Sequence, residues 1–153
     1  MIVVSDTSVI TSLIQIGRAS LLKNLYNTVL IPAAVDAELQ RTHTQLPTFL
    51  EVRLAANRVM VARLEAELDL GEAEAIVLAK ETNADLLLID EKLGRQAALR
   101  EGLRITGLIG LVIEAKQQGL IPSVREIVAR LELEAGFRLS DAVKIEAFRL
   151  ADE

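Results

Sequence analysis

The sequence contains no cysteine and no tryptophan, and its only histidine is His43. Without cysteine the chain can form neither a disulfide framework nor a thiolate zinc site, which fits a reducing compartment. A single histidine leaves almost no material for a Ser-His-Asp or Cys-His arrangement of catalytic groups. These absences argue against catalysis by a nucleophilic triad.

Long apolar runs and phosphate-binding loops are missing as well. No stretch reaches membrane-spanning length, and residues 1–6 have no basic segment ahead of a long apolar run. We therefore expect no signal peptide, no membrane contact and a cytoplasmic location. The segment 107–110 (GLIG) lacks the lysine and the spacing of a Walker loop, which argues against hydrolysis of nucleoside triphosphates.

The remaining composition is that of a folded domain. The 153 residues are 51% hydrophobic and 25% charged, so we expect a single domain that spans residues 1–153 and has a proper core. The formal net charge is −5. This charge argues against broad, non-specific binding of nucleic acid by the whole surface, but it leaves room for a local basic patch.

The stretch 85–95 (DLLLIDEKLGR) organises the rest of the chain. Its apolar run is too short for a buried helix and does not alternate, which predicts a strand covered on both faces. The run ends in Asp90, and helical spacing follows over 91–99. The carboxylate of Asp90 is therefore expected at the C-terminal end of a strand, the edge at which open α/β sheets bind ligands.

Other segments alternate between strand and helix patterns. Strands are predicted at 2–4, 28–31 and 103–106, with a short edge strand at 59–61, and 41–48 is predicted to be a loop that leads into a helix ending at 57. Further helices are predicted over residues 9–14, 19–26, 33–40, 73–82, 107–118, 123–133 and 140–150. This alternation predicts an α/β fold, a three-layer sandwich with a central, mostly parallel sheet.

Acidic residues stand at the boundaries of these elements. Asp6 follows the first strand and Asp90 the organising strand, so their carboxylates should lie within roughly 5–10 Å if the two strands are neighbours. Two carboxylates about 4 Å apart repel by roughly 4 kcal/mol at an effective dielectric constant near 20, so such a cluster requires a cation. Oxygen ligands alone favour Mg²⁺ or Mn²⁺, which can activate water against a phosphodiester.

Each of these acids also has a purely structural interpretation. Asp6 and Asp90 can cap the helices that follow them, since aspartate is a preferred N-cap residue. Asp69 and Glu72 have the spacing of a capping box, which explains Asp69 well. Arg95 is most simply a solvent-exposed helix residue.

Four segments together resemble PIN-domain ribonucleases. They are Asp6-Thr7-Ser8 after the first strand, the acid-bearing helix after Ile31-Pro32, residues 70–76 (LGEAEAI) and residues 88–91 (LIDE). The resemblance is closest to prokaryotic PIN proteins related to VapC toxins, and it covers a core of about residues 1–120. We expect residues of about 121–153 to form a C-terminal helical extension. Three roles are open for it: packing on the sheet, forming the interface of a homodimer, or binding an antitoxin.

The resemblance implies a Mg²⁺- or Mn²⁺-dependent endoribonuclease that hydrolyses RNA and acts as the toxin of a toxin–antitoxin pair. It implies RNA, a cognate antitoxin and a second copy of the chain as partners. Carried over by position, the catalytic and metal-binding acids are Asp6, Glu38, Glu72 and Asp90, and the accessory residues are Thr7, Ser8 and Asp69. VapC proteins have an aspartate where this chain has Glu72, so Glu74 and Asp69 are alternatives for the third acid.

Two other functions are weighed against this one. A non-catalytic or regulatory nucleic-acid-binding PIN module would keep the fold, although the acidic net charge fits it poorly. A receiver-like signalling domain also places acids at strand ends, but it requires a lysine after a late strand. Residues 103–107 (LRITG) offer none.

Overall fold

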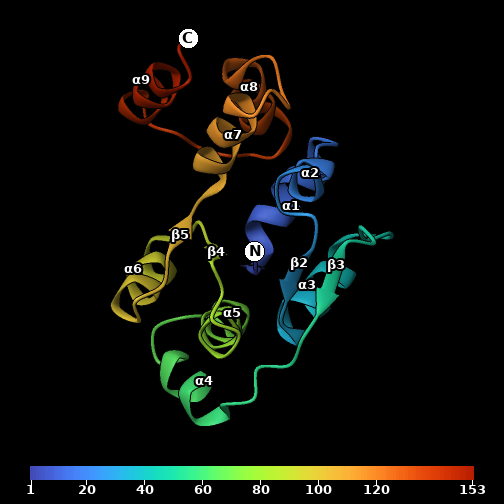
Figure 1. The fold of residues 1–153 in the computed structure, drawn as a ribbon, viewed down its shortest axis with the longest axis vertical. Coiled ribbons are helices and arrows are strands. Elements are labelled where there is room, and N and C mark those ends of the chain that lie inside the picture. Colours follow the sequence, from blue (N-terminus) through green and yellow to red (C-terminus); the bar gives the residue numbers. More distant parts are fainter.

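The computed structural model describes all residues from 1 to 153, and its centre is a five-stranded parallel sheet (Figure 1). The strands are β1 (Val3–Ser5), β2 (Val29–Ile31), β3 (Leu50–Val52), β4 (Leu86–Leu88) and β5 (Ile105–Thr106), in the spatial order β3-β2-β1-β4-β5. All four strand pairs are parallel. The predicted α/β architecture is thus confirmed, with β1 in the middle of the sheet and the organising strand, β4, beside it.

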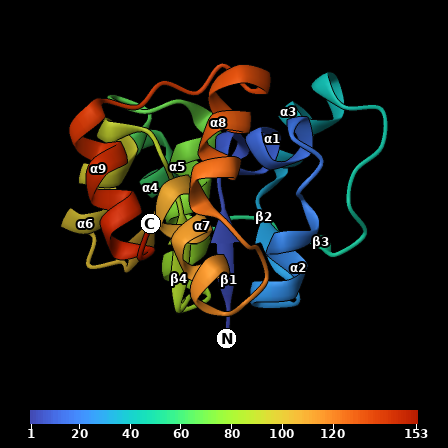
Figure 2. The same cartoon turned by 90° about the horizontal axis from the view of Figure 1, so that it is seen from above.

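Nine helices cover both faces of this sheet. They are α1 (Thr7–Gln15), α2 (Ser20–Tyr26), α3 (Ala33–Thr42), α4 (Arg58–Leu64), α5 (Leu70–Glu81), α6 (Lys92–Arg100), α7 (Leu108–Gln117), α8 (Val124–Glu134) and α9 (Asp141–Leu150). Helices α1, α2, α7 and α8 lie on one face, and α4, α5 and α6 lie on the other (Figure 1). Figure 2 shows α1, α7 and α8 lying over β1. Helix α3 packs against both α1 and α5. None of the helices is long and apolar enough to cross a membrane.

The two-sided burial follows from the period of a strand, in which successive side chains point to opposite faces. Val3 and Leu88 belong to the core cluster under α1, α7 and α8, whereas Val4 and Leu87 belong to the cluster under α4, α5 and α6. All four are almost fully buried. Apolar runs without alternation are therefore required here, as in other parallel sheets that are covered on both faces.

The sequence prediction was wrong about the edge of the sheet. Residues 59–61, predicted as an edge strand, lie in helix α4, which Asn57 caps by accepting a hydrogen bond from the Met60 amide at 3.1 Å. Met60, Val61 and Leu64 are buried at helical spacing, and this packing outweighs the strand preference of the valines. One edge strand is instead β3, which lies in the segment 49–57 that was predicted as a helix, and the other is β5, which was predicted as a strand.

The C-terminal helices pack onto the rest of the molecule. Ser123 and Ser140 cap α8 and α9, as expected for helices starting at these points. Helix α8 buries four apolar side chains in the cluster that also contains α1 and α7, namely Val124, Ile127, Val128 and Leu131. The apolar run at the start of α7 also packs in the core, because Leu108, Leu111 and Val112 are fully buried.

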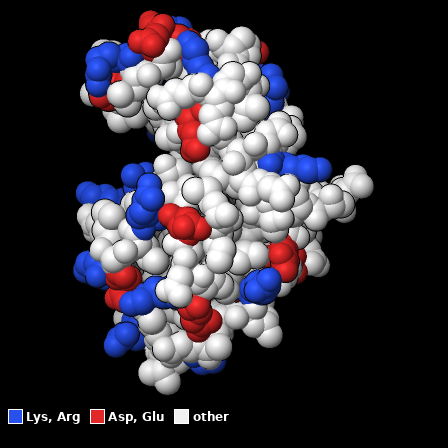
Figure 3. All heavy atoms as spheres, in the orientation of Figure 1, with Lys and Arg blue, Asp and Glu red and all other residues white.

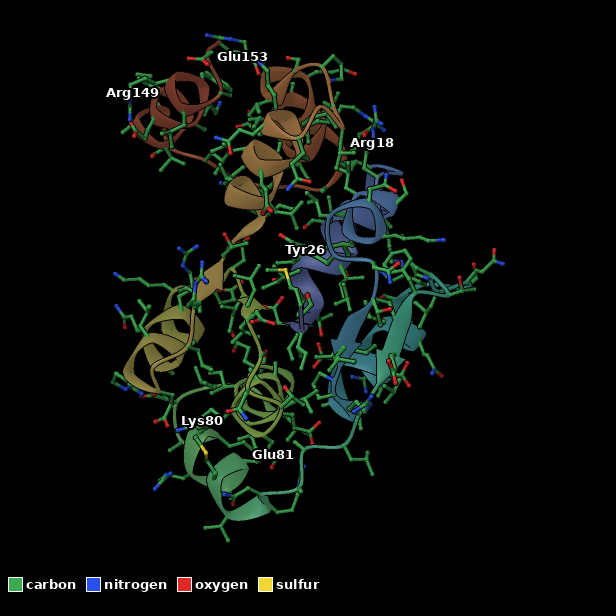
Figure 4. The ribbon with its side chains drawn as sticks, viewed as in Figure 1. Arg18, Tyr26, Lys80, Glu81, Arg149 and Glu153 are labelled. Carbon is green, nitrogen blue, oxygen red and sulfur yellow. The ribbon has the colours of Figure 1, made fainter.

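Glu153 fastens α9 to α8 and α7. Its carboxylate accepts hydrogen bonds from the Val124 amide at 2.6 Å and from Ser123 Oγ at 2.8 Å, and it forms an ion pair with Lys116 at 3.0 Å. Figure 4 shows Glu153 at the end of α9, next to α8. Burial acts to raise the pKa of Glu153, but the Val124 amide and Lys116 outweigh it and lower that pKa to about 2.

Candidate metal centre

Asp6 and Asp90 follow neighbouring strands at the point where the strand order reverses. Strand β1 is joined to β2 on one side and to β4 on the other, so the carboxyl ends of β1 and β4 flank a topological switch point. Ser5 pairs with Leu88, and the Asp6 amide donates to the Leu88 carbonyl at 3.0 Å. Open α/β sheets bind ligands in the crevice at such a point.

A polar cavity of about 590 Å³ lies at this edge of the sheet. The first residues of α1, α5 and α6 line it, together with the C-terminal half of α3. Six of its lining residues are acids: Asp6, Glu38, Glu67, Asp69, Glu72 and Glu91. The positive ends of three helix dipoles therefore face a group of carboxylates, which partly offsets the repulsion among them.

Asp6 is both a helix cap and a member of this acidic group. Its side chain accepts a hydrogen bond from the Val9 amide at 3.3 Å and another from Ser8 Oγ at 3.3 Å. Only 2% of the residue is exposed. Burial raises the pKa of Asp6 to about 7; the Val9 amide lowers it, and the carboxylates of Asp90 and Glu72 raise it further. The two interpretations open for Asp6 in the sequence therefore do not exclude each other.

Glu72 uses one carboxylate oxygen for capping and leaves the other free. Its amide donates to Asp69 Oδ1 at 2.8 Å and the Asp69 amide donates to Glu72 Oε1 at 3.3 Å, which completes the capping box. Glu72 Oε2 is buried and has no hydrogen-bond partner. The hydroxyl of Thr7 is likewise buried and without a partner. Burial raises the pKa of Glu72, and the charge of Asp69 adds to this shift.

Glu38 reaches the cavity because glycine lies opposite it. A Cβ at Gly71, in the first turn of α5, would stand 2.7 Å from Glu38 Oε1, closer than real Cβ contacts. Gly94 plays the same part for Glu72, whose Oε2 would lie 2.8 Å from a Cβ at that position. A side chain at Gly71 would therefore displace the carboxylate of Glu38, and one at Gly94 would displace that of Glu72.

Asp90 stands slightly apart from the other three predicted acids. Its Oδ1 accepts a hydrogen bond from the Leu108 amide at 3.1 Å, at the start of α7, and it lines a second cleft rather than the main cavity. Burial raises the pKa of Asp90, whereas the Leu108 amide and Arg95 lower it. Arg95 is half-buried near this carboxylate, not solvent-exposed as its place in the sequence suggested.

The remaining predicted residues divide between the cavity and the scaffold. Thr7, Ser8 and Asp69 line the cavity. Glu74 does not: its carboxylate accepts the Ala34 amide at 2.8 Å and pairs with Arg58 at 2.8 Å, so it fixes the start of α3.

Four charged residues of the cavity were missed by the sequence analysis: Glu67, Glu91, Arg41 and Lys92. Glu91 directly follows Asp90 in the sequence, and Arg41 is three residues after Glu38, a spacing that places both on one helix face. These two could have been found from their spacing. Glu67 and Lys92 carry no comparable signal.

The donor set fits a hydrated Mg²⁺ or Mn²⁺. Every candidate ligand is an oxygen, and two buried oxygens, Glu72 Oε2 and Thr7 Oγ1, lack partners. As the side chains stand, no three of the acids converge closely enough to hold one ion. Mg²⁺ usually keeps several waters and binds through only one or two carboxylates, so the arrangement suits a partly hydrated ion.

Comparison with known proteins identifies the family of the chain. No curated protein matches the sequence. A family model described as a PIN domain matches residues 2–153, a span that includes the acidic cavity and the C-terminal helices α8 and α9. The chain therefore belongs to the PIN-domain family.

Proposed function

We propose that this protein is a Mg²⁺- or Mn²⁺-dependent endoribonuclease. PIN domains are generally metal-dependent nucleases, so membership of the family implies a nucleic-acid substrate. The proposal rests above all on the acids at the switch point, where Asp6, Glu38 and Glu72 line one cavity. The raised pKa of Asp6, about 7, is what burial beside other uncompensated carboxylates produces.

The protein's own residues would hold and orient the reacting groups. A bound Mg²⁺ or Mn²⁺ would supply an activated water and positive charge at the phosphodiester. Asp6, Glu38, Glu72 and Asp90 would hold the ion, and Glu72 would contribute the buried oxygen that has no hydrogen-bond partner. The hydrogen bond from Ser8 fixes Asp6, and the one from Leu108 fixes Asp90.

The test is cleavage of a single-stranded RNA by the purified protein. Cleavage should require Mg²⁺ or Mn²⁺, stop in EDTA and leave 5′-phosphate ends, because water is the nucleophile. Asp6→Asn should lower kcat by about 100-fold or more, as expected when a metal ligand is lost. His43→Ala is the matched control and should cleave normally, since His43 contacts Thr11 rather than an acid. Cleavage in EDTA, or its loss in His43→Ala, would exclude this mechanism.

One observation favours the alternative, a non-catalytic nucleic-acid-binding module. No three acids converge on one point as the side chains stand. Such a module would bind RNA in the same assay without producing new ends in either metal. The endoribonuclease is the better-supported function, because the partnerless buried oxygens of Glu72 and Thr7 have no role in a purely structural site.

We further propose that the protein is the toxin of a toxin–antitoxin pair and forms a homodimer. The resemblance to VapC toxins supports the first point. Exposed apolar side chains of α9, namely Val143, Ile145 and Leu150, offer a surface for an antitoxin or a second copy. Expression in a bacterium should arrest growth, and Asp6→Asn should relieve the arrest. A small reading frame directly upstream is expected, and light scattering should give twice the chain mass.

A further inference from the structure

A second cleft, of about 430 Å³, lies on the other side of Asp90 from the acidic cavity. It forms where α6, β5 and the start of α7 meet residues 137–139, between α8 and α9. Figure 3 shows a hollow between the part of the molecule that contains α8 and α9 and the part below it, with basic side chains gathered over α6 and β5. Asp90 lines this second cleft, and the next residue, Glu91, lines the acidic cavity, so the two hollows lie next to each other.

The two basic side chains of this cleft make no stabilising polar contact within the protein. Arg95 and Arg138 line it, and neither guanidinium forms an ion pair or donates a hydrogen bond to any group of the protein. Eight other basic residues do form ion pairs with acids. Two free guanidiniums facing one cleft are suited to bind an anion, because guanidinium matches phosphate geometry.

Arg95 is held close to Asp90 without neutralising it. Gly107 allows this approach, since a Cβ there would stand 2.6 Å from both Arg95 Nη1 and Asp90 Oδ1. No hydrogen bond or ion pair joins Arg95 to Asp90, whose Oδ1 accepts the Leu108 amide, so the donors of Arg95 stay available. An anion bound by Arg95 would thus lie next to a carboxylate of the metal centre.

The other wall of the cleft is apolar and includes an aromatic ring. Phe137 lines it beside Ile109 and Leu139. The whole chain has only three phenylalanines and one tyrosine, so a half-buried ring at this position is a scarce feature. A base can stack on such a ring whatever its identity.

The acidic cavity itself carries two more free cations, on its opposite sides. Arg41 of α3 and Lys92 of α6 line it, and neither pairs with any of the six acids around them. Along α6, free cations therefore run from Lys92, which lines the acidic cavity, to Arg95, which lines the second cleft together with Arg138. This order suits a polyanion that crosses the acids and continues into the second cleft.

We propose that the second cleft binds the RNA strand beside the scissile bond, with Arg95 and Arg138 on a phosphate and Phe137 stacked on the adjoining base. This inference rests on the proposed ribonuclease function. It explains how a chain with a net charge of −5 can hold RNA, since the attraction is local. It also assigns a role to residues 137–139, which belong to the C-terminal part of the chain.

The decisive experiment compares Arg138→Gln with Arg104→Gln in cleavage and binding of a single-stranded RNA. Both arginines are exposed and unpaired, but Arg104 precedes β5 and does not line the cleft, so it is a matched control. Arg138→Gln should raise KM about fivefold with kcat nearly unchanged, and it should reduce the salt dependence of log Kd by about 0.7. Phe137→Leu should also raise KM, because stacking is lost. Arg104→Gln should match the wild type in every respect.

The outcomes separate this inference from the proposed function. If the wild type cleaves RNA and Arg138→Gln has the KM of Arg104→Gln, the cleft does not bind the strand and the ribonuclease stands. If Arg138→Gln lowers kcat at unchanged KM, the arginine supports the metal centre instead, and the inference is overturned. If the wild type binds RNA through Arg138 but never cleaves it, RNA binding in the cleft is supported and the proposed ribonuclease activity is refuted. If it does neither, both fall.

Discussion

Replacing Asp6 by asparagine should stabilise the metal-free protein at about pH 8 and change its stability little at about pH 4. Burial and the neighbouring acids raise the pKa of Asp6 from 3.8 to about 7. A carboxyl with a raised pKa favours the folded state while it is protonated. This stabilisation is complete below pH 3.8 and is lost as the pH rises through about 7.

The size of the effect follows from this shift. Each pKa unit corresponds to 1.36 kcal/mol, so a shift of about three units costs the wild type up to about 4 kcal/mol at high pH. Asparagine carries no charge and avoids this cost. It can still accept the Val9 amide, and it caps helices about as well as aspartate. The advantage of Asp6→Asn should therefore grow with pH up to that limit.

Urea unfolding in EDTA at a series of pH values measures this difference. Asp36→Asn is the control, because the Asp36 carboxylate accepts a hydrogen bond from Gln40 and does not line the cavity. Mg²⁺ should narrow this difference, since at 100 times its Kd it stabilises the wild type by about 2.7 kcal/mol and the variant much less. A difference between Asp6→Asn and the wild type that is independent of pH would refute this reasoning.

Three further variants test other parts of the structure. Gly71→Ala should keep or raise the melting temperature, because alanine favours helix by up to about 1 kcal/mol, yet it should slow RNA cleavage by displacing Glu38. Glu74→Gln should cost about 1–3 kcal/mol in urea unfolding, because the buried Glu74 side chain loses its charge, and with it the ion pair with Arg58 and the charge-assisted character of the hydrogen bond from the Ala34 amide. Mg²⁺ should stabilise this variant as much as the wild type, and a loss of that stabilisation would indicate that Glu74 binds the metal. Glu153→Gln should lower the melting temperature at neutral pH, and the difference should disappear as the pH falls from 4.5 through about 2, where the depressed pKa of Glu153 lies. A difference that persists at the acid end would contradict that role.

The parallel sheet was predictable because each inner strand must be apolar on both faces. Val3, Val4 and the run over Leu86–Leu88 carry this signal in only a few residues. The same signal locates the carboxyl ends of β1 and β4, and with them Asp6 and Asp90. Burial thus encodes both the fold and the position of the switch point.

The edge strand and the second cleft could not be predicted in this way. Strand β3 is half-exposed and only three residues long, so no periodicity distinguishes it from a loop. The segment 137–139 and Arg95 line one cleft although they are more than 40 positions apart in the sequence, and they do so only because α8 and α9 fold back onto the rest of the molecule. Such contacts depend on the packing of whole helices, which local sequence patterns do not specify.

The central claim is that a divalent ion held at Asp6, Glu38, Glu72 and Asp90 cleaves RNA. The most direct test measures bound Mn²⁺ by electron paramagnetic resonance and the RNA cleavage rate in the same samples across a Mn²⁺ titration. The account predicts one half-saturation concentration for binding and cleavage in the wild type, and the loss of both in Asp6→Asn. Cleavage at Mn²⁺ concentrations where no ion is bound, or full Mn²⁺ binding by Asp6→Asn, would contradict it.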